Sequence, residues 1–188
     1  MTSKGHLLLL CSPAMGSGKS TAAEYLVNRH NWSRVVFAEP IKGMTWTLLA
    51  CAGVDAPYDY VHGNKKEELI PALGTTSRRI QQLLGTEFGR NYLGENVWTD
   101  LAMRRADHLR SLGHNVVIDD MRFYNEFAAG LAAGGVPVRI RRKGVRVTTP
   151  THASEGALDG IQMSEIDNSG TVEQLHRSMD VLVASLFS

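Results

Sequence analysis

A glycine-rich segment near the start of the chain has the residue types needed to bind phosphate. Glycines let backbone amides wrap closely around phosphate oxygens, and the N-terminus of a following helix favours negative charge. Lys19 would reach the β- and γ-phosphates of a nucleoside triphosphate, and the Ser20 hydroxyl would ligate Mg²⁺. Pro13 stands where the usual phosphate-loop pattern begins with glycine. The alternative to a phosphate loop is a glycine-rich turn between a strand and a helix that binds no ligand. We predict that ATP phosphates are bound by Ala14, Met15, Gly16, Ser17, Gly18, Lys19, Ser20 and Thr21.

A pair of aspartates could supply the acidic partner that such a phosphate loop needs for its metal. Asp119 and Asp120 directly follow the apolar run Val116-Val117-Ile118. In an open α/β sheet, ligands bind beyond the carboxyl ends of the strands. Neighbouring residues on a strand point in different directions, so one of the two is expected to hold Mg²⁺ through water or to position the nucleophile. A solvated turn is the alternative.

Basic residues are concentrated in one short stretch, where five of the eight residues 139–146 are Lys or Arg. Planar guanidinium groups can clamp the negative charge that phosphoryl transfer spreads over the transferring group. We therefore predict that one or more of Arg139, Arg141 and Arg142 are catalytic. The polar segment at about 139–163 is expected to form a lid that closes on the substrate. A solvated or RNA-contacting basic strand is the alternative.

The elements that must position these residues alternate between strands and helices. Apolar runs predict strands at 7–11, 35–37, 116–118 and 136–140. Helical periodicity and end signals predict helices at 19–29, 40–52, 77–88, 97–112 and 123–133 and from Thr171 onward. Residues 53–76 are expected to form a loop with one short helix near 67–72. This alternation predicts an α/β protein: one domain with the three-layer P-loop NTPase fold, a mainly parallel five-stranded sheet and a lid.

Composition and charge narrow the classes of function. With 20 basic and 19 acidic residues among 188, the formal net charge is +1, which argues against a bulk nucleic-acid binder. No apolar run approaches the roughly 20 residues that span a bilayer, and none resembles a secretory signal. We therefore expect a cytoplasmic protein without a membrane partner. Cys11 and Cys51 lack metal-ligand spacing and are expected to be buried, reduced thiols.

Motifs spread along most of the chain resemble those of the bacteriophage deoxynucleoside monophosphate kinases. The phosphate loop is generic, whereas the combination of the other motifs in this order is fairly specific. Two positions differ from the family pattern: Pro13, and Glu39 where the family has Asp. The motifs are Phe37-Ala38-Glu39-Pro40-Ile41-Lys42, Arg79-Ile80-Gln81-Gln82-Leu83-Leu84-Gly85-Thr86-Glu87-Phe88-Gly89-Arg90 with a later Trp98, Asp120-Met121-Arg122-Phe123-Tyr124-Asn125-Glu126, His152-Ala153-Ser154-Glu155 and Asp167-Asn168-Ser169-Gly170.

The resemblance implies transfer of the ATP γ-phosphoryl group to a deoxynucleoside 5′-monophosphate on a sheet like that of nucleoside monophosphate kinases. It implies that Asp120 is the acidic residue at the metal and that Asn168 belongs to the ATP site. Trp98 would stack on a base or, as an apolar helix residue, form part of the core. The acceptor is expected to bind mainly within about 38–98, and the implied acceptor residues are Glu39, Lys42, Arg79, Arg90, Trp98, Arg122, Glu126 and Glu155.

Other functions stay open from the sequence. Phosphomevalonate kinases and dephospho-coenzyme A kinases also combine a phosphate loop with a basic lid. A nucleotide switch or a nucleic-acid-binding ATPase subunit would use residues 139–146 to contact a phosphate backbone. That basic stretch is short and the remaining chain is not basic, so we expect no stable nucleic-acid partner. The apolar faces of the helices at 97–112 and after 171 would belong either to the core or to a homodimer surface.

Overall fold

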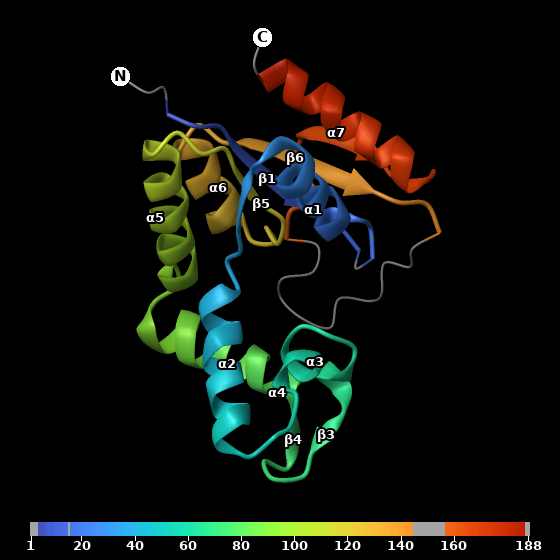
Figure 1. Ribbon diagram of the computed structural model, residues 1–188. Coiled ribbons are helices and arrows are strands. Elements are labelled where there is room, and N and C mark those ends of the chain that lie inside the picture. Colours follow the sequence, from blue (N-terminus) through green and yellow to red (C-terminus); the bar gives the residue numbers. More distant parts are fainter. Residues whose placement is uncertain (1–3, 15, 145–156, 187–188) are drawn as a thin grey trace. The chain divides into compact units, whose positions relative to one another are not determined.

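The computed structural model describes residues 4–14, 16–144 and 157–186 (Figure 1). The chain forms two compact units. The first unit comprises the described residues up to Val36 and from Ala102 onward. The second unit is Phe37–Leu101. Its range is close to the 38–98 that we assign to acceptor binding.

The first unit is built on a five-stranded parallel sheet with the order β2-β5-β1-β6-β7. In register, Leu8 of the central strand lies opposite Val117 on one side and Val136 on the other. The described pairings in this sheet are all parallel, which confirms the predicted fold class. The strands are β1 (Leu7–Cys11), β2 (Ser33–Val35), β5 (Val116–Ile118), β6 (Val136–Arg141) and β7 (Ser164–Asp167).

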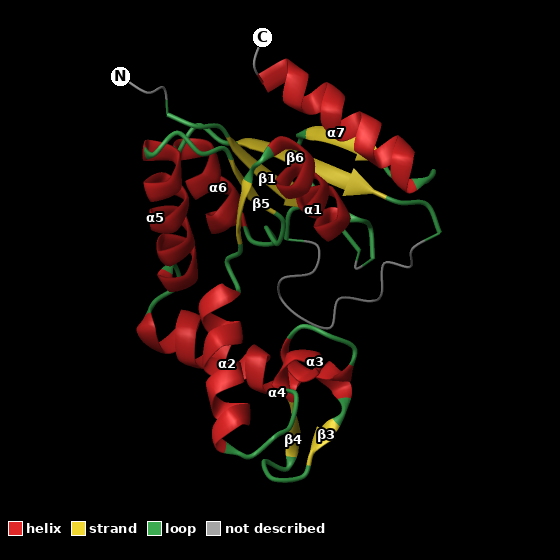
Figure 2. Ribbon diagram, viewed as in Figure 1, coloured by secondary structure: helices red, strands yellow, loops and turns green. Residues whose placement is uncertain are grey.

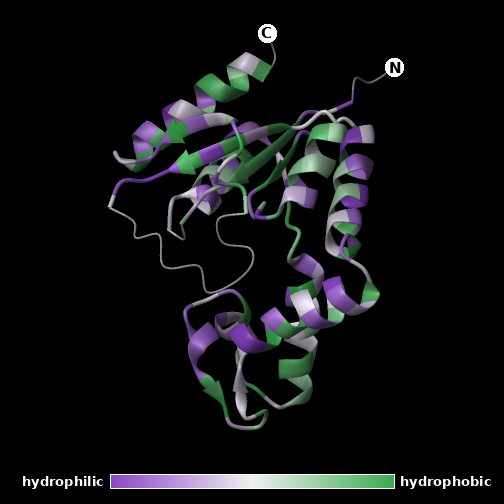
Figure 3. Cartoon of the chain, turned by 180° about the vertical axis from the view of Figure 1, so that it is seen from behind, coloured by the Kyte–Doolittle hydropathy of each residue, from purple (hydrophilic) through white to green (hydrophobic). Residues whose placement is uncertain are grey.

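Helices cover both faces of this sheet (Figure 2). On one face, α1 (Lys19–His30) and α7 (Val172–Leu186) bury Leu8 and Leu10 together with their own apolar residues. On the other face, α6 (Tyr124–Ala132) comes so near that a Cβ at Gly130 would lie 2.4 Å from Leu9. Strands covered on both sides are apolar along their whole length, as the green central strands of Figure 3 show.

The buried side chain of Arg110 connects three segments of the first unit through hydrogen bonds to backbone carbonyls. Arg110 near the end of α5 (Val97–Ser111) donates from Nε to the carbonyl of Gly5 at 2.7 Å. Its Nη1 donates to the carbonyl of Ala133, just after α6, at 2.9 Å. The side chain of Arg110 therefore links the segment before β1 to the helices α5 and α6.

The second unit is mainly helical and has its own small core of Leu49, Val61, Ile70 and Ile80. The prediction of a loop over 53–76 with a helix near 67–72 was wrong. Two-residue strands and a one-turn helix are too short to show a periodicity in the sequence. The elements are α2 (Glu39–Cys51), α3 (Pro57–Val61), a 3₁₀ turn (Lys65–Glu67), an antiparallel β3 (Leu69–Ile70) and β4 (Thr75–Thr76), α4 (Ser77–Gln82) and a π-helix (Leu83–Leu93).

The structure also bears on the expectations for the two cysteines and for the last helix. Cys11 is buried, but Cys51 is exposed at the end of α2, so its prediction as a buried thiol was wrong. Leu175, Met179 and Val183 of α7 lie in the core, which is the first of the two alternatives for this apolar face. Among the helices that the structure describes, none has the length and apolarity needed to cross a bilayer.

Candidate active site

The turn between β1 and α1 is braced from within by two serine side chains. The backbone N–H of Ala14 donates to Ser12 Oγ at 3.2 Å. Ser12 Oγ lies 2.5 Å from Ser17 Oγ, which donates to the Ala14 carbonyl at 2.7 Å. Ser17 is 2% exposed. The hydroxyl groups thus satisfy the inside of the turn, while the glycines beside them shape its outer backbone.

Two glycines give this turn its backbone path into the helix. Gly16 and Gly18 have φ angles of 75° and 95°, which lie in the left-handed region where glycine carries little penalty. Gly18 is the N-cap of α1, and the first turn of that helix contains no acidic residue. The N-terminal amides of α1 therefore present a positive helix end that suits a phosphate group. Met15 lies outside the described residues.

Asn168, which we predict to bind the cofactor, lies against the back of this turn. Its side-chain amide donates to the Ser17 carbonyl at 2.9 Å, and its backbone N–H donates to the Arg141 carbonyl at 2.7 Å. A Cβ at Gly18 would come within 2.2 Å of Asn168 Nδ2. Asn168 therefore holds the loop after β7 to the turn before α1, and glycine at 18 makes this close approach possible.

The charges of Arg122, Asp119 and Asp120 act on Lys19, which lies in the first turn of α1. Its pKa is lowered, first by burial and then by the charge of Arg122. The charges of Asp119 and Asp120 act in the opposite direction. A partly desolvated ammonium group gains from an anionic ligand. Lys19 follows β1, and the aspartates and Arg122 follow its parallel neighbour β5, so their charges act on one another at the carboxyl ends of these strands.

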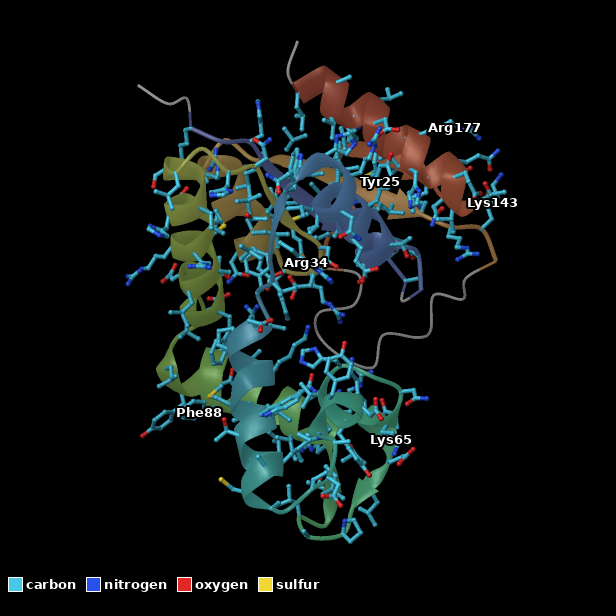
Figure 4. The ribbon with its side chains drawn as sticks, in the orientation of Figure 1. Tyr25, Arg34, Lys65, Phe88, Lys143 and Arg177 are labelled. Carbon is cyan, nitrogen blue, oxygen red and sulfur yellow. The ribbon has the colours of Figure 1, made fainter. Side chains whose placement is uncertain are left out.

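The two aspartates at the end of β5 have different surroundings. Asp119 is 3% exposed and accepts hydrogen bonds from Arg34 Nε at 2.8 Å and Arg34 Nη2 at 2.6 Å. Arg34 is labelled in Figure 4. Asp120 is only partly buried. Asp120 is therefore the more accessible carboxylate at this strand end. The sequence analysis missed Arg34, because a single arginine in a short strand carries no motif.

Glu126 and Arg122 occupy the loop that follows these aspartates. Glu126 is 3% exposed, and its Oε2 accepts from the backbone N–H groups of Arg122 at 2.7 Å and Phe123 at 3.0 Å. This arrangement caps the N-terminus of α6. Glu126, which we predict to bind the acceptor, therefore shapes the loop that carries Arg122, whose own side chain is exposed.

The three arginines predicted to be catalytic do not share one environment. Arg139 is 4% exposed, and its guanidinium donates to Glu165 Oε1 at 2.8 Å and to the carbonyls of Leu158 at 2.6 Å and Ile161 at 3.0 Å. These bonds hold the turn before β7 against the sheet. Arg141 and Arg142 are exposed, and Arg141 Nε lies 2.9 Å from Glu165 Oε2. Residues 145–156 of the predicted lid, which include Glu155, lie outside the described residues.

The predicted acceptor residues of the second unit are spread over several elements. Glu39 and Lys42 lie in the first turn of α2. The pKa of His62, a residue that the sequence analysis did not single out, is lowered first by burial and then by the charge of Lys42. Arg79 is exposed on α4. Arg90 in the π-helix donates from Nη1 to the Glu95 carbonyl at 3.3 Å.

Trp98 has the surroundings of a core residue. It is 4% exposed, and its indole N–H donates to the Gly85 carbonyl at 2.8 Å. A Cβ at Gly89 would meet the Trp98 ring at 2.2 Å, so the ring lies directly on that backbone. Of the two alternatives for Trp98, packing in the second unit is the one that its contacts favour.

Comparison with known proteins places the chain in a family. A protein of Acanthamoeba polyphaga mimivirus named "Putative deoxynucleotide monophosphate kinase" is 30% identical over 176 residues, covering 86% of this chain and 88% of that protein. The chain belongs to the deoxynucleotide monophosphate kinase family. No protein-family model matches it. An APS kinase mutant, CysC of Mycobacterium tuberculosis, has a TM-score of 0.47 at 11% identity, covering 97% of this chain and 99% of its own. A dephospho-CoA kinase from Campylobacter jejuni has a TM-score of 0.47 at 13% identity. That match covers 97% of this chain and 98% of the kinase.

The oxygen donors of this deoxynucleotide monophosphate kinase family member fit the chemistry of Mg²⁺. Ser20 is exposed in the first turn of α1, and Asp120 is the accessible carboxylate at the end of β5. Mg²⁺ in such sites takes one or two protein oxygens and fills its other positions with water and phosphate oxygens. The described residues contain no cluster of three or more His, Cys, Asp or Glu side chains arranged for a metal.

Proposed function

We propose that this protein transfers the γ-phosphoryl group of ATP to a deoxynucleoside 5′-monophosphate, giving a deoxynucleoside diphosphate and ADP. The observation that carries the proposal is the braced, glycine-shaped turn before α1, which follows β1 and lies next to the strand β5 that Asp120 follows. The charges of Arg122 and Asp120 on Lys19 support it. Family membership supports the deoxynucleotide acceptor. The motifs quoted above support a bacteriophage-type member of this family.

On the donor side, the backbone amides of the turn and the ammonium group of Lys19 bind the ATP phosphates. Asn168 keeps the turn in place through the Ser17 carbonyl. Ser20 and Asp120, the latter through water, would hold Mg²⁺. When bound, Mg²⁺ neutralises phosphate charge. Positive groups fixed before the reaction stabilise the charge that develops during transfer without reorganising.

On the acceptor side, an oxygen of the monophosphate attacks the γ-phosphorus while the bond to the β–γ bridging oxygen breaks and ADP leaves. No general base is needed, because the attacking phosphate oxygen is already ionised. In the first unit, we assign Arg122 to the acceptor phosphate, since a guanidinium group matches a phosphate with two parallel hydrogen bonds. In the second unit, the residues assigned to the acceptor are Glu39, Lys42, Arg79 and Arg90.

Around the transferring group, we assign direct contact to Arg141 and Arg142 and a supporting role to Arg139. The bonds of Arg139 to Glu165, Leu158 and Ile161 support the second assignment. The lid over 139–163, the homodimer and the cytoplasmic location stay predictions.

A coupled assay that follows ADP release tests the proposed function. Each of the four deoxynucleoside monophosphates is offered as acceptor, with phosphomevalonate and dephospho-coenzyme A as competing substrates. Stimulation by a deoxynucleotide is expected. ADP release only with phosphomevalonate or dephospho-coenzyme A would assign a different kinase activity, and no nucleotide-dependent release would contradict the proposal.

A substitution in the phosphate turn tests the site itself. Lys19→Ala should lower kcat/KM by about 10²–10³-fold, because it removes a preorganised positive charge from the transferring group. Its melting temperature should stay close to that of the wild type. Lys4→Ala is the matched control, since Lys4 is half exposed and pairs with Asp107. Wild-type turnover by Lys19→Ala would rule out this assignment of the site.

A further inference from the structure

The ion pair between Arg34 and Asp119 has no part in the roles proposed above. Arg34 lies on β2 and Asp119 directly follows β5, the parallel neighbour of β2. Nε and Nη2 of Arg34 each donate to a different oxygen of Asp119, at 2.8 Å and 2.6 Å. Such a two-point contact is the strongest and most directional form of an ion pair. Both oxygens of Asp119 are thus held by one guanidinium group.

The burial of Asp119 makes this contact consequential. The side chain of Asp119 is 2% exposed, whereas that of Arg34 is 33% exposed. A buried carboxylate that loses its partner keeps the cost of desolvation without the compensating attraction. It would therefore be attracted to another positive charge at the same strand ends.

Lys19 begins α1 after β1, and β1 is the parallel neighbour of β5, which Asp119 directly follows. The charge of Asp119 also acts on the ammonium group of Lys19. Lys19 is also the residue that the proposed function assigns to the ATP phosphates. A carboxylate paired with Lys19 would compete with those phosphates for the same ammonium group. Arg34 itself is balanced from its other side, where Nη1 lies 3.8 Å from Glu24 Oε1. The arrangement directs Asp119 toward Arg34.

We infer that Arg34 is a positioning residue of the nucleotide site, which holds both oxygens of Asp119 and thereby keeps Lys19 available for ATP. The inference rests on the proposed function, since it concerns the donor site of that reaction. Arg34 acts through Asp119 and need not touch the nucleotide. The pair is also directional in a way that lysine cannot reproduce, because an ammonium group does not present two parallel N–H donors.

A double-mutant cycle separates this role from a direct contact with ATP. The variants are Arg34→Gln, Asp119→Asn and the double variant, and equilibrium ATP binding is measured together with kcat and KM for each substrate. Arg34→Gln should weaken ATP binding about tenfold, within the range of coupling energies of contacting residues. The KM of the acceptor should change much less. The double variant should bind ATP within about threefold of wild type, because the competing charge of Asp119 is gone.

Several outcomes would overturn the inference. The inference is wrong if Arg34→Gln binds ATP as strongly as the wild type does. Equal or greater loss in the double variant is another such outcome, because it would show that Arg34 or Asp119 contacts the nucleotide or its metal directly. Arg34→Lys should fall between Arg34→Gln and wild type, and Arg105→Gln on the exposed side of α5 is the matched control.

Circular dichroism and melting curves accompany each variant, because a buried unpaired carboxylate destabilises the fold. If Arg34→Gln does not fold, Asp119→Asn and the double variant decide the question, since neither buries an unpaired carboxylate. Both should then retain ATP binding, and loss of binding in folded protein would overturn the inference. Failure of the proposed function is recognised separately, by a wild-type protein that does not bind ATP or does not phosphorylate deoxynucleotides.

Discussion

The side-chain amide of Asn168 and the backbone carbonyl of Ser17 are joined by a 2.9 Å hydrogen bond between residues 151 positions apart. Both residues are buried. The same asparagine binds the Arg141 carbonyl through its backbone N–H at 2.7 Å. The geometry of the phosphate turn therefore depends on a loop near the other end of the chain.

Replacement of Asn168 tests this dependence. Asn168→Asp should be folded but should bind ATP more weakly, because a carboxylate facing the Ser17 carbonyl repels it and removes the donor. Asn168→Ala leaves that carbonyl without its partner and should lower the free energy of unfolding by about 1–3 kcal/mol. Denaturant melts and ATP titration measure both effects. Asn28→Ala, at an exposed position of α1, is the control. ATP affinity unchanged in Asn168→Asp would contradict the anchoring role.

Trp98 offers a test between packing and base stacking. Trp98→Leu should lower the free energy of unfolding by about 2–4 kcal/mol, as expected for a large-to-small change in a core. The acceptor KM should stay within about threefold of wild type, since the ring lies on Gly89 and bonds to Gly85. A control is Trp46→Leu on α2, where the side chain is 39% exposed. A large rise in acceptor KM at unchanged stability would instead assign Trp98 to the substrate.

Arg110 should contribute to stability without contributing to catalysis. Arg110→Met removes hydrogen bonds to the carbonyls of Gly5 and Ala133 and should cost about 2–4 kcal/mol of unfolding free energy. The kcat/KM of the folded fraction should not change. Arg105→Met, exposed on the same helix, should unfold like wild type. Equal melting curves for the two variants would show that the buried bonds of Arg110 are not stabilising.

Asp180 should make part of the stability depend on pH. Its carboxylate accepts a hydrogen bond from Tyr25 Oη at 2.8 Å and lies 2.7 Å from His30 Nε2. Both contacts lower the pKa of Asp180, and the contact with His30 has the larger effect. A depressed carboxyl pKa contributes stability that is complete above the unfolded value of about 3.9. That stability is lost as the pH falls through the folded pKa.

The melting temperature of Asp180→Asn should therefore lie below that of wild type near pH 6, and the difference should shrink below about pH 4. Asn28→Ala, at an exposed position of α1, removes no titratable group and should differ from wild type by the same amount at both pH values. A difference between Asp180→Asn and wild type that stays constant down to pH 3 would refute the assignment.

Elements whose cause is local could be predicted from the sequence. The strands Leu7–Cys11 and Val116–Ile118 coincide with the predicted ranges, because strands buried on both faces leave continuous apolar runs. The edge strand Ser164–Asp167 was missed, since it is polar and largely exposed. The short β3–β4 pair was missed because its strands have two residues each.

The same distinction holds at the site. The phosphate turn is one contiguous segment, so its residue types reveal it. The role of Arg34 comes from a partner 85 positions away, and Arg139 is distinguished from Arg141 only by the turn at 158–161 that it binds. Neither pairing leaves a trace in local spacing. The lowered pKa of His62, caused first by burial and then by the charge of Lys42, likewise has no sign in the local sequence.

The chain leaves the sheet after β2, forms the second unit, and returns to the sheet through α5 and β5. The strands β2 and β5 are direct neighbours in the sheet. Segments inserted between fixed ends can change in length and sequence with little effect on the framework that carries them. The order and register of the sheet therefore do not depend on the length of the segment between β2 and α5. Under the proposed division of labour, acceptor residues in that segment can change while the phosphate turn, Asp120 and Asn168 stay the same.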